Sequence, residues 1–107
     1  MKNTVYLILL SLAADDRHGS GIMRDVLDLT DGEVRLWPAT LYGTLDELRA
    51  NGWIDELSDP AERPEGESER KRFYRITRAG RRTLAAETER LASVVEEARA
   101  RMTERRA

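Results

Sequence analysis

Apolar residues recur along this chain at the spacing of α-helices in four stretches, and two short stretches alternate in the manner of β-strands. The first helix is expected to run to about residue 14, with Asn3 or Thr4 as its cap. It is apolar on nearly its whole circumference, so it either forms the centre of the core or buries a second side against another chain. The sequence leaves both interpretations open. Its main apolar stripe consists of Val5, Ile8, Leu9 and Leu12.

A polar break at residues 15–19 precedes a second helix, expected at about residues 20–29. Residues 34–36 are expected to form a short strand. Pro38 suits the first position of a third helix, because its missing N–H is not needed there. That helix is expected to stop at Asn51-Gly52. Its buried face consists of Leu41, Leu45 and Leu48, and its opposite face of Ala39, Gly43, Asp46 and Ala50.

Residues 53–57 and 72–76 have the pattern of a hairpin, joined by a loop rich in Pro, Gly, Ser and Glu at residues 58–69. Thr77 is expected to cap a long final helix. The apolar residues of this helix have the a/d spacing of a coiled coil, with Thr88 in the remaining slot. This stripe is longer than a three-helix core covers, so dimerisation is its expected use. Its members are Leu84, Leu91, Val95, Ala98 and Met102.

The composition excludes several kinds of site. The chain has 107 residues, enough for one domain, and it has no cysteine and a single histidine, so disulfides, thiolate metal sites and zinc clusters are excluded. No nucleophile or carboxylate cluster accompanies His18, so we expect it to cap or turn the chain, and we expect no catalytic residue, metal or cofactor. The apolar run at residues 5–12 is shorter than the roughly 20 residues that span a bilayer. A cytoplasmic protein with no membrane partner is therefore expected.

Charge is distributed unevenly along the chain. Residues 1–69 contain 6 Lys and Arg against 15 Asp and Glu, whereas residues 70–82 contain 7 basic residues and no acidic one. Such a concentrated basic segment favours a polyanion or an acidic partner. A solvated hairpin edge is the alternative interpretation.

The order of helix, helix, short strand, helix, two-stranded hairpin and long helix is that of a winged helix-turn-helix: mainly α, with a small β-hairpin. Residues 1–77 are expected to bind DNA and residues 78–107 to dimerise. In this fold the third helix enters the major groove and the wing lies along the DNA backbone. Ala39 and Gly43 would allow close approach to base edges, while Thr40 and Tyr42 could donate hydrogen bonds. Most of the electrostatic attraction would come from Arg70, Lys71, Arg72 and Arg75.

Three motifs occur together and in order. They are His18-Gly19-Ser20-Gly21 before the second helix, Pro38-Ala39-Thr40-Leu41-Tyr42 at the third, and Tyr74-Arg75-Ile76-Thr77 with Gly80 at the exit of the wing. Because these three motifs occur together, the sequence resembles the PadR family of transcriptional regulators over essentially its whole length.

That resemblance implies a homodimeric repressor that binds an inverted repeat in double-stranded DNA. Members of the family often release DNA when a phenolic, drug-like or other small effector binds. The resemblance places DNA contacts at Ser20, Thr40, Tyr42 and the basic residues of the wing. It also implies dimers formed through the first and last helices, whose apolar residues are given above.

Three departures from the family pattern keep a second interpretation open. Trp37 stands where a small capping residue is usual, Asp46 and Glu47 stand where basic residues are common, and the wing loop is acidic. The second interpretation is a winged-helix module that binds a protein through its basic wing, with weak or no sequence-specific DNA binding. Trp37 is expected to be partly buried, the alternative being that it lines an effector pocket, and Trp53 is expected in the core of the hairpin.

Overall fold

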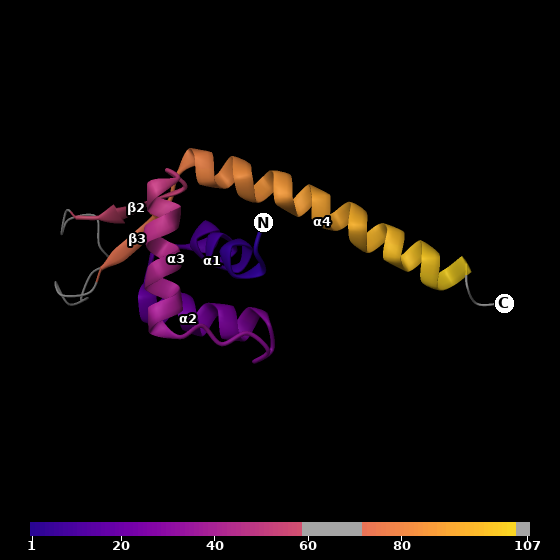
Figure 1. The fold of residues 1–107 in the computed structure, drawn as a ribbon, viewed down its shortest axis with the longest axis horizontal. Coiled ribbons are helices and arrows are strands. Elements are labelled where there is room, and N and C mark those ends of the chain that lie inside the picture. Colours follow the sequence, from indigo (N-terminus) through magenta and orange to yellow (C-terminus); the bar gives the residue numbers. More distant parts are fainter. Residues whose placement is uncertain (59–71, 105–107) are drawn as a thin grey trace.

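The computed structural model describes residues 1–58 and 72–104, which form helices and a small antiparallel sheet (Figure 1). The architecture is mainly helical with a winged hairpin and a long C-terminal helix, so the predicted fold class is confirmed. The elements are α1 (Asn3–Ala14), β1 (Arg17–His18), α2 (Gly19–Leu29), α3 (Pro38–Ala50), β2 (Ile54–Leu57), β3 (Phe73–Ile76) and α4 (Arg78–Glu104).

The sheet has the order β1-β3-β2, with both pairings antiparallel. Tyr74 of β3 lies opposite Arg17 of β1 and Glu56 of β2, so the central strand is paired on both edges. The short strand was predicted in the wrong place. Residues 34–36 form no strand, and the short strand is β1, which lies in the polar break before α2.

Helix α1 is the central helix of the fold. It packs between α2 and α4 and against β3 (Figure 1). Ile8, Leu9 and Leu12 are essentially fully buried within the single chain. Of the two interpretations that the sequence left open for α1, the structure shows the core helix. The burial of these three side chains leaves them little surface for a dimer contact, and the contribution of α1 to an interface stays a prediction.

The capping of the helices was predicted in part. The Nδ1 atom of His18 accepts the Gly21 N–H at 3.1 Å, and the hydroxyl of Thr77 accepts the Gly80 N–H at 3.0 Å, as expected for caps of α2 and α4. Helix α1 instead begins after Lys2, without a side-chain cap, so the prediction of Asn3 or Thr4 as its cap is wrong. Helix α3 begins after Trp37, also without a side-chain cap.

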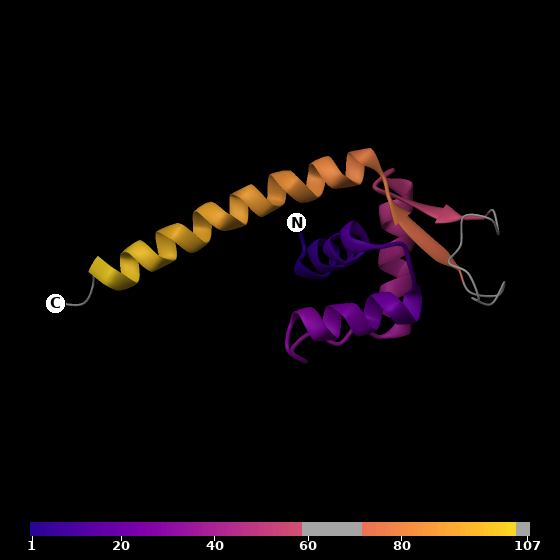
Figure 2. The same ribbon diagram turned by 180° about the vertical axis from the view of Figure 1, so that it is seen from behind.

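Helix α4 extends far beyond the other elements of the fold. Its first half crosses α1, and its second half projects past the other elements in both views (Figures 1 and 2). The structure consequently has extents of 60 × 28 × 24 Å. The hydroxyls of Tyr6 and Thr88 share a hydrogen bond of 2.8 Å, which joins α1 to the middle of α4.

Candidate nucleic-acid interface

The outer face of α3 is small, polar and open. Leu41, Leu45 and Leu48 are buried, so the amphipathic pattern fixes which side of the helix meets solvent. Thr40 and Gly43 are exposed, as the sequence predicted. A Cβ atom placed on Gly43 would meet no atom within 4 Å. Packing within the described chain therefore does not require this glycine, and a second molecule could approach the helix closely here.

Tyr42 lies against the start of α2. Its ring covers Gly19, where an added Cβ would come within 2.8 Å of the ring carbon that carries the hydroxyl. The side chain is still 39% exposed. Ser20, the next residue of α2, is exposed. Two of the predicted DNA contacts, Ser20 and Tyr42, therefore both lie near the N-terminus of α2, where the helix dipole favours an anion.

The wing projects from the side of α3 that faces away from the free end of α4 (Figures 1 and 2). Arg75 forms a bidentate ion pair with Asp16, with an Nη2–Oδ2 distance of 2.8 Å. The Nε atom of Arg72 lies 3.4 Å from Glu56. Arg72 and Arg75 thus both have carboxylate partners within the chain, and they are not simply displayed toward solvent. Arg70 and Lys71 lie outside the described residues, as does the acidic segment 59–69.

Sequence reasoning missed the carboxylates that accompany these arginines. Asp16 comes from the segment before β1, and Glu56 comes from β2, where it also lies 4.0 Å from Arg49 of α3. Neither position carries a local pattern that signals an ion pair. The pairing arises from the register of the sheet, which brings residues 16 and 75 together across 59 positions of the chain.

Tyr74 is the largest fully buried side chain and lies at the centre of this charged region. Burial raises the pKa of its phenol above the usual 10.0, and the nearby Glu56 carboxylate acts in the same direction, while Arg72 opposes them. Tyr74 therefore remains a neutral structural residue under the wing.

The outer half of α4 carries the apolar residues that remain available for another surface. Leu84 is buried within the single chain, and Leu91 is half-buried. Val95, Ala98 and Met102 are exposed, with Met102 at 65%. Val5 is buried, so the exposed part of the predicted interface lies on α4. The sequence pattern missed Val94, which is also exposed.

Glu87 is a buried charged residue of α4. Its side chain is buried, and both carboxylate oxygens accept hydrogen bonds of 2.7 Å from Arg90, one turn further along. These hydrogen bonds hold the pKa of Glu87 below its usual value. The same contact raises the pKa of Arg90.

The two tryptophans also differ from each other. Trp53 is partly buried beside the core, as expected for the hairpin. Trp37 is 64% exposed, so the prediction that it is partly buried is wrong.

Within residues 1–58 and 72–104, no helix is long and apolar enough to cross a membrane. The same residues contain no group of three or more metal-ligating side chains.

Solved structures with the same fold include regulators of transcription. A transcriptional regulator from Clostridium thermocellum matches with a TM-score of 0.73 and 25% identity, over 90% of this chain and 86% of that one. A PadR family transcription regulator from Clostridium difficile matches with a TM-score of 0.75 and 18% identity, over 94% and 99%. A winged-helix DNA-binding protein from STIV matches with a TM-score of 0.71 and 18% identity, over 89% and 94%. No curated protein sequence matches.

The open recognition-type helix, the wing and these structural matches define a winged-helix regulator of transcription. The model of the transcriptional regulator PadR-like family matches residues 8–86. The chain therefore belongs to the PadR-like family, whose members are regulators and not enzymes.

Proposed function

We propose that this protein is a homodimeric repressor that binds an inverted-repeat operator through α3 and the wing, and that a small effector releases it. The observation that best supports this proposal is the open outer face of α3 around Gly43. Beside that face, Tyr42 lies against Gly19, next to the exposed Ser20 at the N-terminus of α2, where a phosphate would be favoured. Residues 1–77 would carry DNA binding.

The dimer would form through residues 78–107 together with the surface around α1. The exposed Val95, Ala98 and Met102 support this part of the proposal, because the second half of α4 has no packing partner within the described chain. A twofold dimer would place two copies of α3 about 34 Å apart, the spacing of successive major grooves. That spacing is the geometric reason to expect an inverted repeat.

The test uses Gly43→Gln, because the structure leaves room for a side chain there. The added side chain should abolish sequence-selective binding to the DNA upstream of the protein's own gene, measured by fluorescence anisotropy. Thermal stability should not fall, because glycine costs about 1 kcal/mol in a helix relative to alanine. Ala50→Gln, on the same outward face at the other end of α3, is the matched control and should bind like wild type.

One observation favours a second candidate function. The wing arginines Arg72 and Arg75 both have carboxylate partners in the subunit, which reduces the charge available to phosphates. A winged-helix module that binds a protein would have this property. A wild-type protein with no sequence-selective DNA binding even at low salt would favour this module and contradict the repressor.

A further inference from the structure

Two carboxylates, Asp46 and Glu47, lie beside Gly43 on the open side of α3. Both are exposed and both lie one turn beyond the glycine along the helix. At about 100° per residue, Asp46 points about 60° to one side of Gly43 and Glu47 about 40° to the other. A molecule that approaches α3 closely at Gly43 therefore meets a carboxylate on each side.

The two carboxylates differ in their partners. Asp46 lies 3.9 Å from the guanidinium of Arg49, one turn further along the helix. Across the part of the chain that the structure describes, the Glu47 side chain forms neither a hydrogen bond nor an ion pair. The residues three and four positions beyond Glu47 are Ala50 and Asn51, so the helix itself provides no cation for it.

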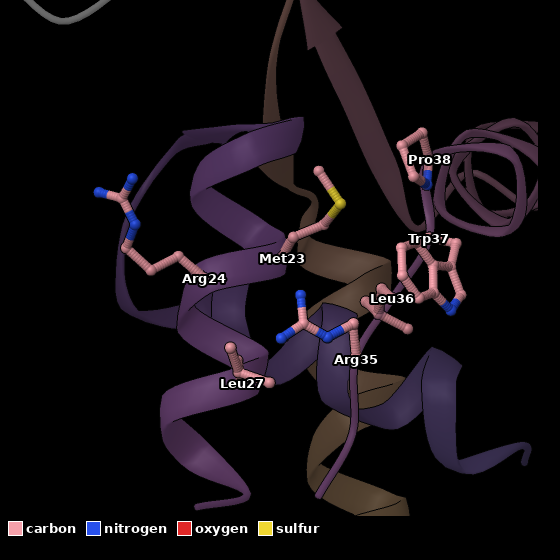
Figure 3. A pocket seen from close by; sticks show the side chains of 7 residues that line it. All are labelled: Met23, Arg24, Leu27, Arg35, Leu36, Trp37 and Pro38. Carbon is pink, nitrogen blue, oxygen red and sulfur yellow. The ribbon is translucent and has the colours of Figure 1, made fainter. Parts of the chain in front are cut away.

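The arginines nearest to α3 in the sequence have other contacts. Arg49 lies 4.0 Å from Glu56 of β2, on the side of the wing. Arg35 comes before the helix and lines the pocket in Figure 3, where its guanidinium carbon is 5.7 Å from the centre of the Trp37 ring. Glu47 thus keeps its full negative charge on the surface that is proposed to meet DNA.

The position of Glu47 has two electrostatic costs. It lies in the last turn of α3, where the helix dipole disfavours a negative charge. Its carboxylate also repels the phosphates that supply most of the affinity of a DNA-binding protein. One contact in the major groove uses such a group, because a carboxylate accepts a hydrogen bond from the N4 amino group of cytosine. Guanine and thymine present only acceptors or a methyl group there, and adenine presents an acceptor beside its amino group.

We propose that Glu47 is a specificity-determining residue that accepts a hydrogen bond from the N4 amino group of a cytosine in the operator. Gly43 allows the close approach that this contact needs. Glu47 lies about 6 Å beyond Gly43 along the axis of α3, close to two base-pair steps. Asp46 is held by Arg49 and reads no base. This inference rests on the proposed function and adds to it the base that α3 selects.

The first test is selection from a random DNA library, followed by sequencing of the bound fraction. The wild-type motif should contain a cytosine that Glu47→Ala no longer selects, with a loss of at least about fivefold in preference at that position alone. Glu47→Gln should shift the preference toward adenine, because a carboxamide pairs with the N6 and N7 atoms of that base. Asp46→Asn, the same loss of charge on the other side of Gly43, is the control and should keep the wild-type base preferences.

The second test removes the amino group from the DNA. In the selected operator, pyrimidin-2-one replaces the cytosine, and affinity is measured by fluorescence anisotropy. The wild-type protein should lose at least about fivefold in affinity, and Glu47→Ala should lose no more than its own substitution costs. The analogue also weakens pairing with guanine, so the comparison between the two proteins isolates the contact. The same analogue at a cytosine outside the motif is the control.

Three results would overturn the contact. Glu47→Ala that binds every sequence more tightly by one common factor, with an unchanged motif, would show that Glu47 only repels phosphates. Equal losses for the two proteins with the analogue would show that the amino group is not read by Glu47. The same change of base preference in Asp46→Asn would assign the effect to net charge. A wild-type protein that selects no motif would instead contradict the proposed function itself, which distinguishes that failure from a motif that does not depend on Glu47.

Discussion

Arg75 of β3 and Asp16 before β1 hold each other in a bidentate ion pair, with both the Nε and Nη2 atoms donating to the carboxylate. The arginine is 46% exposed and the aspartate 26%, so the pair lies at the surface, where solvent and salt screen it. In a DNA complex, a phosphate would compete with Asp16 for the same guanidinium. Asp16 would thereby lower the share of the Arg75 charge that reaches DNA.

We predict that Asp16→Asn strengthens DNA binding by about two- to fivefold, the range expected for an exposed ion pair. Release of Arg75 to a phosphate should also steepen the dependence of log affinity on log salt by up to about 0.9, the slope for one added phosphate contact. Fluorescence anisotropy over a series of salt concentrations measures both quantities.

Asp15→Asn is the matched control. Asp15 is the neighbouring carboxylate and accepts only a local hydrogen bond from the Asp16 N–H among the contacts of the described chain. Asp15→Asn makes the same charge change but leaves the ion pair between Asp16 and Arg75 intact. Equal effects of the two substitutions would show that Asp16 acts through net charge and not through Arg75.

A second prediction compares two glycines that contact other residues. At Gly80, an added Cβ would meet the carbonyl of Trp53 and come within 2.8 Å of Ile76, and neither can move without displacing the sheet. At Gly19 it would meet the end of the Tyr42 side chain, which can rotate. Gly80→Ala should therefore lower the free energy of unfolding by about 1–3 kcal/mol. Gly19→Ala should cost less stability but displace Tyr42 and weaken DNA binding.

Chemical denaturation and anisotropy on the same samples distinguish the two effects. Gly21→Ala is the control, because its nearest neighbours lie at 3.6 Å or more from the added carbon, an ordinary contact distance. If Gly19→Ala bound DNA like wild type, the contact assigned to Tyr42 would be wrong.

Local patterns predicted the helices well and the strand pairing less well. Pro38 and the leucines of α3 define one amphipathic period, and the structure has this helix at Pro38–Ala50, as the pattern indicates. Strand β1 has only two residues, too few for an alternating pattern, and it exists because β3 offers an unpaired edge. The segment at residues 34–36 is apolar enough to resemble a strand but has no edge to pair with.

The candidate site was predictable where it depends on helix faces and unpredictable where it depends on tertiary pairing. The outward position of Gly43 follows from 100° per residue along α3. The ion pair between Asp16 and Arg75 does not follow from any local pattern, because it requires the register of β1 on β3. The exposure of Trp37 also depends on the path of the chain between two helices, which no local period fixes.

A third prediction concerns the dimer. Val95→Glu places a charge in the exposed apolar stripe of α4, where a second subunit would bury it, and burial of an unpaired charge is strongly unfavourable. The variant should sediment as a monomer at micromolar concentration, where the wild type should be a dimer. Its thermal stability as a subunit should change little, because Val95 is exposed within the subunit.

Ala100→Glu, on the opposite side of α4, is the control and should leave the dimer intact. A wild-type monomer would refute the assignment of this stripe.

The last prediction is the pH dependence contributed by Glu87. Its pKa is lowered in the folded state by the hydrogen bonds from Arg90, so folding favours the charged carboxylate. The resulting stability is present above the unfolded-state pKa of about 4.3 and is lost as the pH falls through the lower folded-state pKa. Glu87→Gln should therefore destabilise the protein at neutral pH. Its difference from wild type in the free energy of unfolding should shrink below about pH 4.

Urea denaturation at a series of pH values measures this difference, with the exposed Glu89→Gln as control. A difference that stays constant down to about pH 3 would show that Glu87 stabilises α4 by packing and not by its charge.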